Sequence, residues 1–306
     1  MYDNITKTSY MINIIFVILF SFETYIMKPH CSYFSFFVTK ITISVFVFIY
    51  SFQYVNAHFQ ELIPTSDIVT QQSISGSLSQ NFLLSLRFTH PMDNGPLMEM
   101  TKPHNFGVLI NGKKRNLLDH LNPVRQANKT TWVAPYKFLE PGDHIFYVSP
   151  APYWDASEKK MILQHTKVVV DGFQGGEGWD KLVELPVEIE PLSRPYGLWT
   201  NNIFRGRVLK KGQPVPFAIV EIEYRNDRDE VKLPFSSYST QVIKADAHGV
   251  FSYGLPRAGW WGFAALTTRA DKISNLNGVP TEVEEAGVIW VFARDMKHMT
   301  LKKKGD

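Results

Sequence analysis

The fold is decided by residues 204–224, which read FRGRVLKKGQPVPFAIVEIEY. Apolar and polar residues alternate on both sides of Gly212, as expected of two half-buried β-strands. Gly212 stands where a hairpin turn requires a positive φ. Pro214 and Pro216 stand where an edge strand can lack a hydrogen-bond donor. The stretch therefore predicts β-strands joined by tight turns.

The same pattern extends over the rest of the chain after residue 57. Helical periodicity is nearly absent, and short apolar or alternating segments recur between turn signals such as Asn111-Gly112 and Pro141-Gly142-Asp143. The expected strands are 82–88, 106–110, 144–148, 161–170, 182–189, 203–209, 218–224, 241–245, 249–253, 262–267 and 288–292. Many short strands at this spacing predict an all-β chain built of β-sandwiches.

A boundary between two sandwich domains is predicted near residues 190–200, where prolines and glycines interrupt the strands. The order of strands and turns over 203–268 resembles the transthyretin-like or carboxypeptidase-regulatory-like sandwich, which implies a binding or scaffolding module. We therefore expect an Ig-like or transthyretin-like sandwich over 58–195. A transthyretin-like sandwich with a short basic tail is expected over 196–306.

Tryptophans mark the expected junction between the two sandwiches. Trp199 and the pair Trp260-Trp261 carry too much apolar surface to remain exposed. Within the pair, we expect Trp260 to pack into the second core and Trp261 into the junction. The alternative is that the rings of Tyr153-Trp154 and of Trp260-Trp261 are exposed, and exposed Trp and Tyr rings can bind sugars.

Residues 1–57 differ in composition from the rest, because they contain no Gly or Trp and hold two apolar stretches, Met11–Phe22 and Ile41–Phe52. The second stretch follows basic residues and ends in Val55-Asn56-Ala57, the pattern of a secretory signal peptide that is cleaved after Ala57. Initiation at Met27 would give a leader of ordinary length. The alternative is a retained membrane helix, although neither run reaches the roughly 18 apolar residues of a membrane span. We expect export to the periplasm.

Composition excludes several classes of protein. The formal net charge is only +3, which argues against a basic nucleic-acid-binding surface. The one cysteine, Cys31, lies in the predicted leader, so the mature chain has no disulfide, no thiolate metal site and no cysteine nucleophile. No serine stands in a G-x-S-x-G motif. We therefore expect a protein that is not an enzyme, with no small-molecule substrate.

Cleavage after Ala57 would make His58 the first residue of the mature chain. The α-amine and imidazole Nδ1 of an amino-terminal histidine can close one six-membered chelate ring on a metal ion. The amine has a pKa near about 8, so a transition metal can displace its proton at neutral pH. Amine and imidazole nitrogens suit Ni, Cu, Co and Zn. The plain alternative is that a histidine follows the cleavage site by coincidence.

Two further histidines are candidate ligands. His90 ends a predicted strand, and the following Pro91 restricts the backbone to an extended form. His165 lies in the long predicted strand 161–170, on the same face as Lys167, and could be a third ligand or an ordinary strand histidine. The remaining histidines stand in or beside turns and are expected at the surface: His104, His120, His144, His248 and His298.

Taken together, these motifs resemble the DUF4198 family. The resemblance rests on Ala57–Pro64, Phe88–Pro91, Lys102–Val108, Pro150–Trp154, His165–Lys167, Gly178–Asp180, Pro191–Leu198 and Gly259–Leu266. Members of that family are described as periplasmic components of cobalt or nickel uptake systems of the ABC or energy-coupling-factor type. The resemblance implies an exported metal-binding protein with an amino-terminal histidine, in which His58 and His90 are ligands and a membrane-embedded uptake transporter is the partner.

Three functions remain open at this stage. The first is Ni²⁺ or Co²⁺ binding in the periplasm for an uptake transporter. The second is a copper protein, because an amino-terminal histidine with a second histidine forms a histidine brace, which occurs in copper carriers and in oxidative enzymes; Tyr153-Trp154 could then supply a substrate face. The third is a metal-free adhesion or sugar-binding sandwich.

Overall fold

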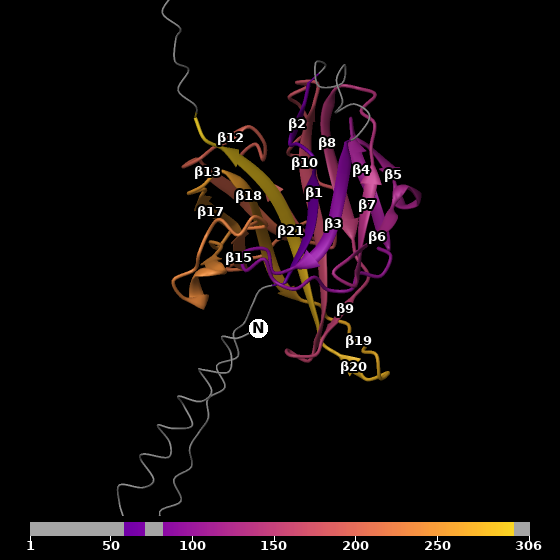
Figure 1. The fold of residues 1–306 in the computed structure, drawn as a ribbon. Helices are drawn as coiled ribbons and strands as arrows, with labels where there is room; N and C mark the ends of the chain where they lie inside the picture. The colour runs from indigo at the N-terminus through magenta and orange to yellow at the C-terminus, as the bar shows by residue number, and fades with distance from the viewer. Residues whose placement is uncertain (1–57, 71–81, 297–306) are drawn as a thin grey trace, which may run out of the picture. The chain divides into compact units, whose positions relative to one another are not determined.

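The computed structural model describes residues 58–70 and 82–296, and these belong to one compact unit, Gln53–Asp306. The predicted leader, 1–57, and the predicted basic tail beyond residue 296 lie outside the described residues. Within the described residues the helices are two single 3-10 turns, η1 (Leu118–His120) and η2 (Ser236–Tyr238). No helix there is long and apolar enough to cross a membrane. This part of the chain is all-β, as predicted (Figure 1).

The largest sheet has eleven strands and forms the middle layer. Its main path is β16-β15-β18-β21-β10-β8-β4-β5, and β2, β9 and β12 pair with strands of that path. The strands of the path are β16 (Gln241–Lys244), β15 (Ile219–Tyr224), β18 (Gly259–Thr268), β21 (Val283–Arg294), β10 (Lys160–Gly172), β8 (Gly142–Ser149), β4 (Asn105–Ile110) and β5 (Lys113–Asn116). The attached strands are β2 (Ile68–Val69), β9 (Tyr153–Asp155) and β12 (Leu198–Trp199).

Smaller sheets cover the two faces of this layer. One is β1 (Phe59–Pro64), β3 (Leu83–Thr89), β7 (Lys129–Pro135) and β6 (Asn122–Gln126), in that order. The other comprises β11 (Val187–Pro191), β13 (Ile203–Lys210), β14 (Gln213–Pro214) and β17 (Val250–Gly254). Figure 1 shows β1, β3 and β7 on one side of β18 and β21, and β13 and β17 on the other. A short hairpin, β19 (Ile273–Ser274) with β20 (Pro280–Thr281), completes the described strands.

The middle strands contribute to both of the two large hydrophobic cores among the described residues. Along β21, Val288 and Trp290 belong to the core beneath β1 and β3, whereas Ile289 and Val291 belong to the core beneath β13. Alternate side chains of a strand point to opposite faces, so one strand can supply two cores. The continuous apolar run predicted as strand 288–292 reflects this burial on both faces.

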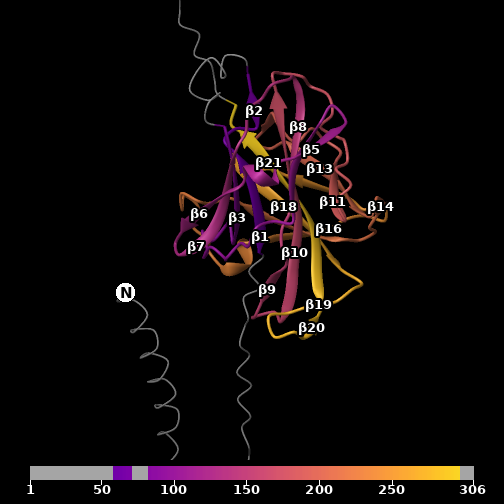
Figure 2. The ribbon, with the colours of Figure 1, turned by 90° about the vertical axis from the view of Figure 1, so that its right-hand side faces the viewer.

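Strands from both sides of the predicted boundary between residues 195 and 196 contribute to the middle sheet and to each of these two cores. β10, from the first half, pairs in parallel with β21 from Met161 opposite Val283 to Val168 opposite Trp290. Figures 1 and 2 show these two strands side by side. Parallel pairing of strands so far apart in sequence leaves no local signal. The two sandwiches therefore share their middle layer, and their division into domains at that boundary stays a prediction.

The tryptophans pack differently from the prediction. Trp261, not Trp260, is buried in the second core, and Trp260 is half-buried against the first core. Neighbouring residues on β18 face opposite cores, so the pair had to be divided between them. Trp199 is 42% exposed, and the expectation that it would be covered was wrong.

Turn chemistry was the most reliable local signal. Gly212 and Gly249 both have φ of 74°, as the predicted hairpin turns require. Asn111 and Gly112 have φ of 48° and 71°, the two positive values of a type I′ turn, and they join β4 to β5. These turns set the lengths and registers of the strands around them.

Substitution of Gly287 should test the close packing of β11 on the middle layer. A Cβ at Gly287 would lie 2.8 Å from the carbonyl carbon and oxygen of Val187, both backbone atoms. We expect Gly287→Ala to lower the free energy of unfolding by about 1–3 kcal/mol, the usual cost of overpacking. Gly254→Ala is the matched control, because nothing lies within 4 Å of a Cβ there. Equal urea midpoints for the two variants would contradict the described packing.

Candidate metal centre

The pairing of β1 with β3 places two of the predicted ligands side by side. The antiparallel register pairs Phe59 with Thr89, so the next residues outward, His58 and His90, stand opposite each other. Opposite residues in such a pair are near enough for their side chains to touch. The centroids of the two imidazole rings lie 4.5 Å apart, with an angle of 51° between the ring planes.

The first strand is held by side chains of the middle layer. Gln164 donates through Nε2 to the carbonyl oxygen of His58 at 2.5 Å, and its Oε1 accepts from the backbone N–H of Gln60 at 2.7 Å. The indole Nε1 of Trp290 donates to the Gln60 carbonyl at 3.0 Å. β1 is buried along its whole length. These bonds fix the backbone at His58, and only 12% of that side chain is exposed.

Asp155 faces the His58 ring from the end of β9. His58 Nε2 lies 3.2 Å from Oδ2 of Asp155, and this buried oxygen has no hydrogen-bond partner. The other oxygen, Oδ1, accepts from the backbone N–H groups of Ser157 and Glu158 and from the Ser157 hydroxyl. The carboxylate is thus anchored on one side by the turn between β9 and β10 and presents its free oxygen to the imidazole.

Ionisation in this cluster favours a neutral imidazole. Burial, followed by the charge of His90, lowers the pKa of His58 to about 4, against the opposite effect of Asp155 and Glu158. Burial raises the pKa of Asp155, but the hydrogen bonds from Ser157 and Glu158 outweigh it and leave that pKa below its ordinary value. At neutral pH the site therefore offers an unprotonated imidazole next to a carboxylate. Those are the protonation states that metal binding requires.

The donor atoms permit two modes of metal binding. Single ligand atoms of His58, Asp155 and Glu158 all lie within 4.8 Å of one another, so these three side chains could hold an ion directly. A histidine at the amino terminus would instead chelate through its amine and Nδ1, since Nε2 is on the far side of the ring. In this second mode Nε2 remains free to donate to Asp155. A carboxylate that accepts from the other ring nitrogen of a ligand histidine fixes its tautomer and orientation.

The segment after His90 is anchored to the second half of the chain. Glu223 of β15 accepts from the backbone N–H of Met92 at 3.1 Å, and Asn226 donates through Nδ2 to the Met92 carbonyl at 3.1 Å. The Met92 side chain is part of the second hydrophobic core. The second sandwich thus positions one of the two histidines.

His165 does not belong to this cluster. Gln164 reaches His58, so the neighbouring His165 points to the opposite face of β10. There its Nδ1 lies 2.9 Å from the Ser149 hydroxyl and its Nε2 lies 3.5 Å from Glu285. The prediction of His165 as a third ligand of this site was wrong, because adjacent residues of a strand point to opposite faces.

Sequence reasoning missed Asp155 and Glu158. The signal that could have found them is the order Asp155-Ala156-Ser157, because an aspartate followed by serine at the second position often closes a turn between strands. A turn at that place folds β9 back on β10 and pairs Asp155 with Lys160, on the strand whose Gln164 binds β1. Which strand would lie across that hairpin could not be read from local sequence.

The other histidines lie away from the cluster. His104, His120 and His248 are exposed, as expected. His144 is fully buried among Tyr136, Phe138 and Phe146, so its expected surface position was wrong. His298 lies outside the described residues.

An apolar cavity adjoins the histidine cluster. Its volume is about 240 Å³, and its walls include Phe88, Met100, Tyr153 and Ile162. The ring centroids of Phe88 and Tyr153 lie 5.6 and 6.0 Å from that of His58. These two aromatic side chains therefore line the cavity and also lie next to the His58 ring.

Comparison with known proteins gives one family. The family described as "Domain of unknown function (DUF4198)" matches residues 55–269. No curated protein matches the chain. Among solved structures, a mutated titin fragment of three Ig domains is 11% identical, with a TM-score of 0.18; the match covers 76% of this chain and 64% of the fragment.

Further structures are similar at the same level. A tandem pair of titin Ig domains is 12% identical, with 76% of this chain and 98% of that chain covered and a TM-score of 0.17. The major pilin subunit of Bacillus cereus is 9% identical and has a TM-score of 0.14. The match covers 81% of this chain and 67% of the pilin chain. Similarity at this level carries no inference about function.

The anchoring of the His90 segment should make stability depend on pH. Burial, partly opposed by hydrogen bonds from Thr240 and Met92, raises the pKa of Glu223 from 4.5 to about 8. The folded state therefore holds this proton more tightly than the unfolded state between these values. The contribution of Glu223 to the free energy of unfolding should therefore fall as pH rises from about 4.5 to 8, by an amount on the order of 4 kcal/mol.

Urea unfolding at pH 5, 7 and 8.5 measures this effect. Glu223→Gln, which is neutral at every pH, should lose this contribution, so its free energy of unfolding should rise relative to that of the native chain as pH increases. Exposed Glu230→Gln should follow the native chain at every pH. An equal fall in the native chain and in Glu223→Gln would contradict the assignment.

Proposed function

Because the chain belongs to the DUF4198 family, we propose that its mature form binds one divalent transition metal ion in the periplasm and passes it to a membrane-embedded uptake transporter. The ion would be Ni²⁺ or Co²⁺, as the family resemblance implies. The observation that supports metal binding is the cross-strand pair His58 and His90, with Asp155 at the His58 ring.

The ligands of the proposed site are nitrogens. Cleavage after Ala57 frees the amine of His58, which joins Nδ1 of the same residue and an imidazole nitrogen of His90. Such donors suit Ni, Co, Cu and Zn. The unpartnered, buried Oδ2 of Asp155 supports the choice of Nδ1, because it lies at the opposite ring nitrogen. Asp155 is then a positioning residue, and Glu158 is not needed as a ligand.

A copper protein is the second candidate. Divalent copper binds nitrogen donors more tightly than nickel or cobalt does, so availability and geometry must decide which ion is carried. The cavity behind Phe88 and Tyr153 favours this candidate in one respect, since an oxidative copper enzyme needs a place for an organic substrate near the metal. The third candidate, a metal-free sandwich, predicts that none of these ions binds.

Removal of either proposed donor should abolish tight binding. The complete sequence is expressed in a host that exports it, and mass spectrometry of the purified protein should show a chain that begins at His58. Calorimetric titration with Ni²⁺, Co²⁺, Cu²⁺ and Zn²⁺ should give one site. Acetylation of the amine or His90→Ala should weaken binding at least about a hundredfold, because each removes a nitrogen ligand.

His248→Ala is the control, because His248 lies exposed in a turn, and it should leave binding unchanged. Oxygen consumption by the copper-loaded protein distinguishes an oxidative enzyme from a carrier. If acetylated protein or His90→Ala binds Ni²⁺ as tightly as the native chain, the proposed site is wrong.

A change at Asp155 should separate the two binding modes. In Asp155→Asn, Ser157 and Glu158 can still donate hydrogen bonds to Oδ1. The new amide nitrogen then faces His58 Nε2 and donates to it. That arrangement favours the tautomer with its proton on Nδ1, the nitrogen needed for chelation. We expect a loss of about 10- to 100-fold in metal affinity, typical of such supporting residues.

The ¹⁵N shifts of the His58 ring in the metal-free protein should report the change of tautomer directly. Glu158→Gln is the matched control and should change affinity little. Equal losses in the two variants would mean that both carboxylates are direct ligands.

A further inference from the structure

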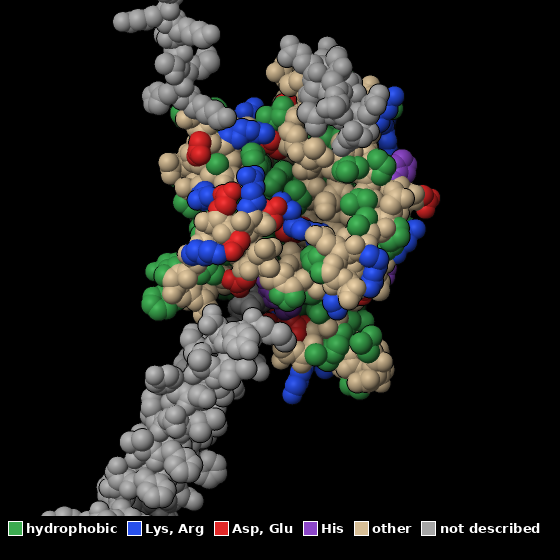
Figure 3. Space-filling model, viewed as in Figure 1, with side chains coloured by type: hydrophobic (Ala, Val, Ile, Leu, Met, Phe, Trp, Pro, Cys, Tyr) green, Lys and Arg blue, Asp and Glu red, His purple; other side chains and the backbone are tan. Residues whose placement is uncertain are grey.

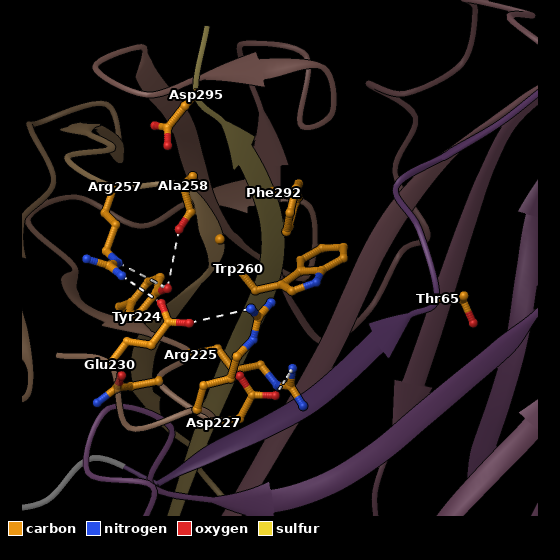
Figure 4. Close-up of a pocket in the computed structure, with 13 residues that line it drawn as sticks. Thr65, Tyr224, Arg225, Asp227, Glu230, Arg257, Ala258, Trp260, Phe292 and Asp295 are labelled. Carbon is orange, nitrogen blue, oxygen red and sulfur yellow. Dashed lines mark hydrogen bonds and ion pairs between the residues drawn. The ribbon is translucent and has the colours of Figure 1, made fainter. Parts of the chain in front are cut away.

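A polar trough lies mainly on the second sandwich, and its lining includes none of the proposed metal ligands. Its volume is about 590 Å³, within the roughly 300–1,000 Å³ of small-molecule sites. It is formed by the segment 225–230 after β15, the turn 257–260 at the start of β18, the end of β21, and Thr65. Figure 4 shows Trp260 and Phe292 in the middle, between Thr65 on one side and Tyr224 with Arg257 on the other.

The charged side chains of the trough balance one another. Its lining holds three arginines and three acidic residues: Arg225, Arg228, Arg257, Asp227, Glu230 and Asp295. On the face seen in Figure 3, basic and acidic side chains are interspersed rather than separated. An anionic or cationic ligand would therefore meet no excess of opposite charge.

The ion pairs leave hydrogen-bonding groups available. Arg257 Nη2 binds Glu230 at 2.7 Å and Arg225 Nη1 binds Asp227 at 2.9 Å. A guanidinium has five N–H donors and a carboxylate has about four acceptor positions. The trough thus presents fixed donors and acceptors in alternation, which suits a neutral ligand rich in hydroxyl groups.

An aromatic surface stands among these polar groups. Trp260 is half-buried, and its ring meets Phe292 edge-to-face at a centroid distance of 5.0 Å. One side of Phe292 is covered by Arg294, whose Cζ lies 4.7 Å from the ring centroid. The indole therefore has apolar support behind it while it lines the trough. The C–H faces of a sugar ring can stack on such a surface.

The trough is pre-formed by its own hydrogen bonds. The Trp261 indole donates to the Arg257 carbonyl at 2.9 Å, and the Tyr224 hydroxyl donates to the Ala258 carbonyl at 3.3 Å. Gly259 has φ of 133°, and a Cβ there would lie 2.5 Å from the Tyr224 ring. On the other wall, Asn226 holds Val231 through both its amide oxygen and its amide nitrogen. A pre-formed site loses little entropy on binding.

We propose that this trough binds a neutral saccharide, with a sugar ring on Trp260 and hydroxyl groups on the paired arginine and acidic side chains. The site uses neither His58 nor His90, so it is independent of the proposed metal function. It also gives a role to the half-buried Trp260 near the start of β18, which metal binding leaves unexplained.

Ligand-observed NMR and calorimetry on the metal-free protein test the proposal. The probes are the neutral trisaccharides maltotriose, cellotriose and chitotriose, with trigalacturonate as an anionic probe and triglycine as a zwitterionic one. At least one neutral trisaccharide should bind. Trp260→Ala should weaken that binding about tenfold or more, and Trp199→Ala, at an exposed tryptophan outside the trough, should not change it.

A second variant keeps the test decisive if Trp260→Ala does not fold. The Arg228 side chain is 82% exposed, so Arg228→Gln should fold normally and weaken binding several-fold. Trp260→Phe should retain part of the affinity. The proposal is overturned if no neutral trisaccharide binds, if only triglycine or trigalacturonate binds, or if the variants that fold bind as tightly as the native chain.

Discussion

The antiparallel pairing of β1 with β3 is the constraint on which the candidate site depends. A shift of one residue in this register would move His58 away from His90 and turn the apolar side chains of β1 to the wrong face. The strand cannot shift without loss, because Gln164 and Trp290 bind its backbone from the middle layer. The chain that follows the predicted leader is therefore built into the fold from its first described residue.

The second half of the chain supports the same site from the other side. Its last strand, β21, supplies Trp290 to β1 and also completes both hydrophobic cores. Its strand β15 supplies Glu223, which binds the segment after His90. The site thus requires both sandwiches, although all of its candidate ligands belong to the first. A site assembled from distant segments, on a sheet that is bonded to the middle layer through Gln164 and Trp290, should be rigid before any metal binds.

Local sequence predicted the strands well where one physical signal was dominant. Apolar alternation located β3, β8, β13, β15 and β18, and turn residues such as Asn111-Gly112 and Gly212 located hairpins. The parallel pairing of β10 with β21 was not predictable, since it joins residues 122 positions apart. Its consequence is the middle layer that the two halves of the chain share.

Sequence predicted the part of the site that depends on local signals and missed the part that depends on long-range strand pairing. His58 and His90 were singled out by the expected cleavage point, by the end of a strand and by family resemblance. Asp155 comes near them only because β9 folds back on β10, which in turn lies across β1. His165 was placed in a strand of nearly the correct length, yet its face could be decided only once the partner of Gln164 was known.

A crystal structure of the exported, Ni²⁺-loaded protein, with the metal located by anomalous scattering at the nickel edge, tests the central account most directly. We predict a chain that begins at His58 and one ion bound by its amine, its Nδ1 and a nitrogen of His90, with Nε2 of His58 donating to Asp155. An ion bound instead by Nε2 of His58 together with Asp155 and Glu158, or an ion far from His90, would contradict it.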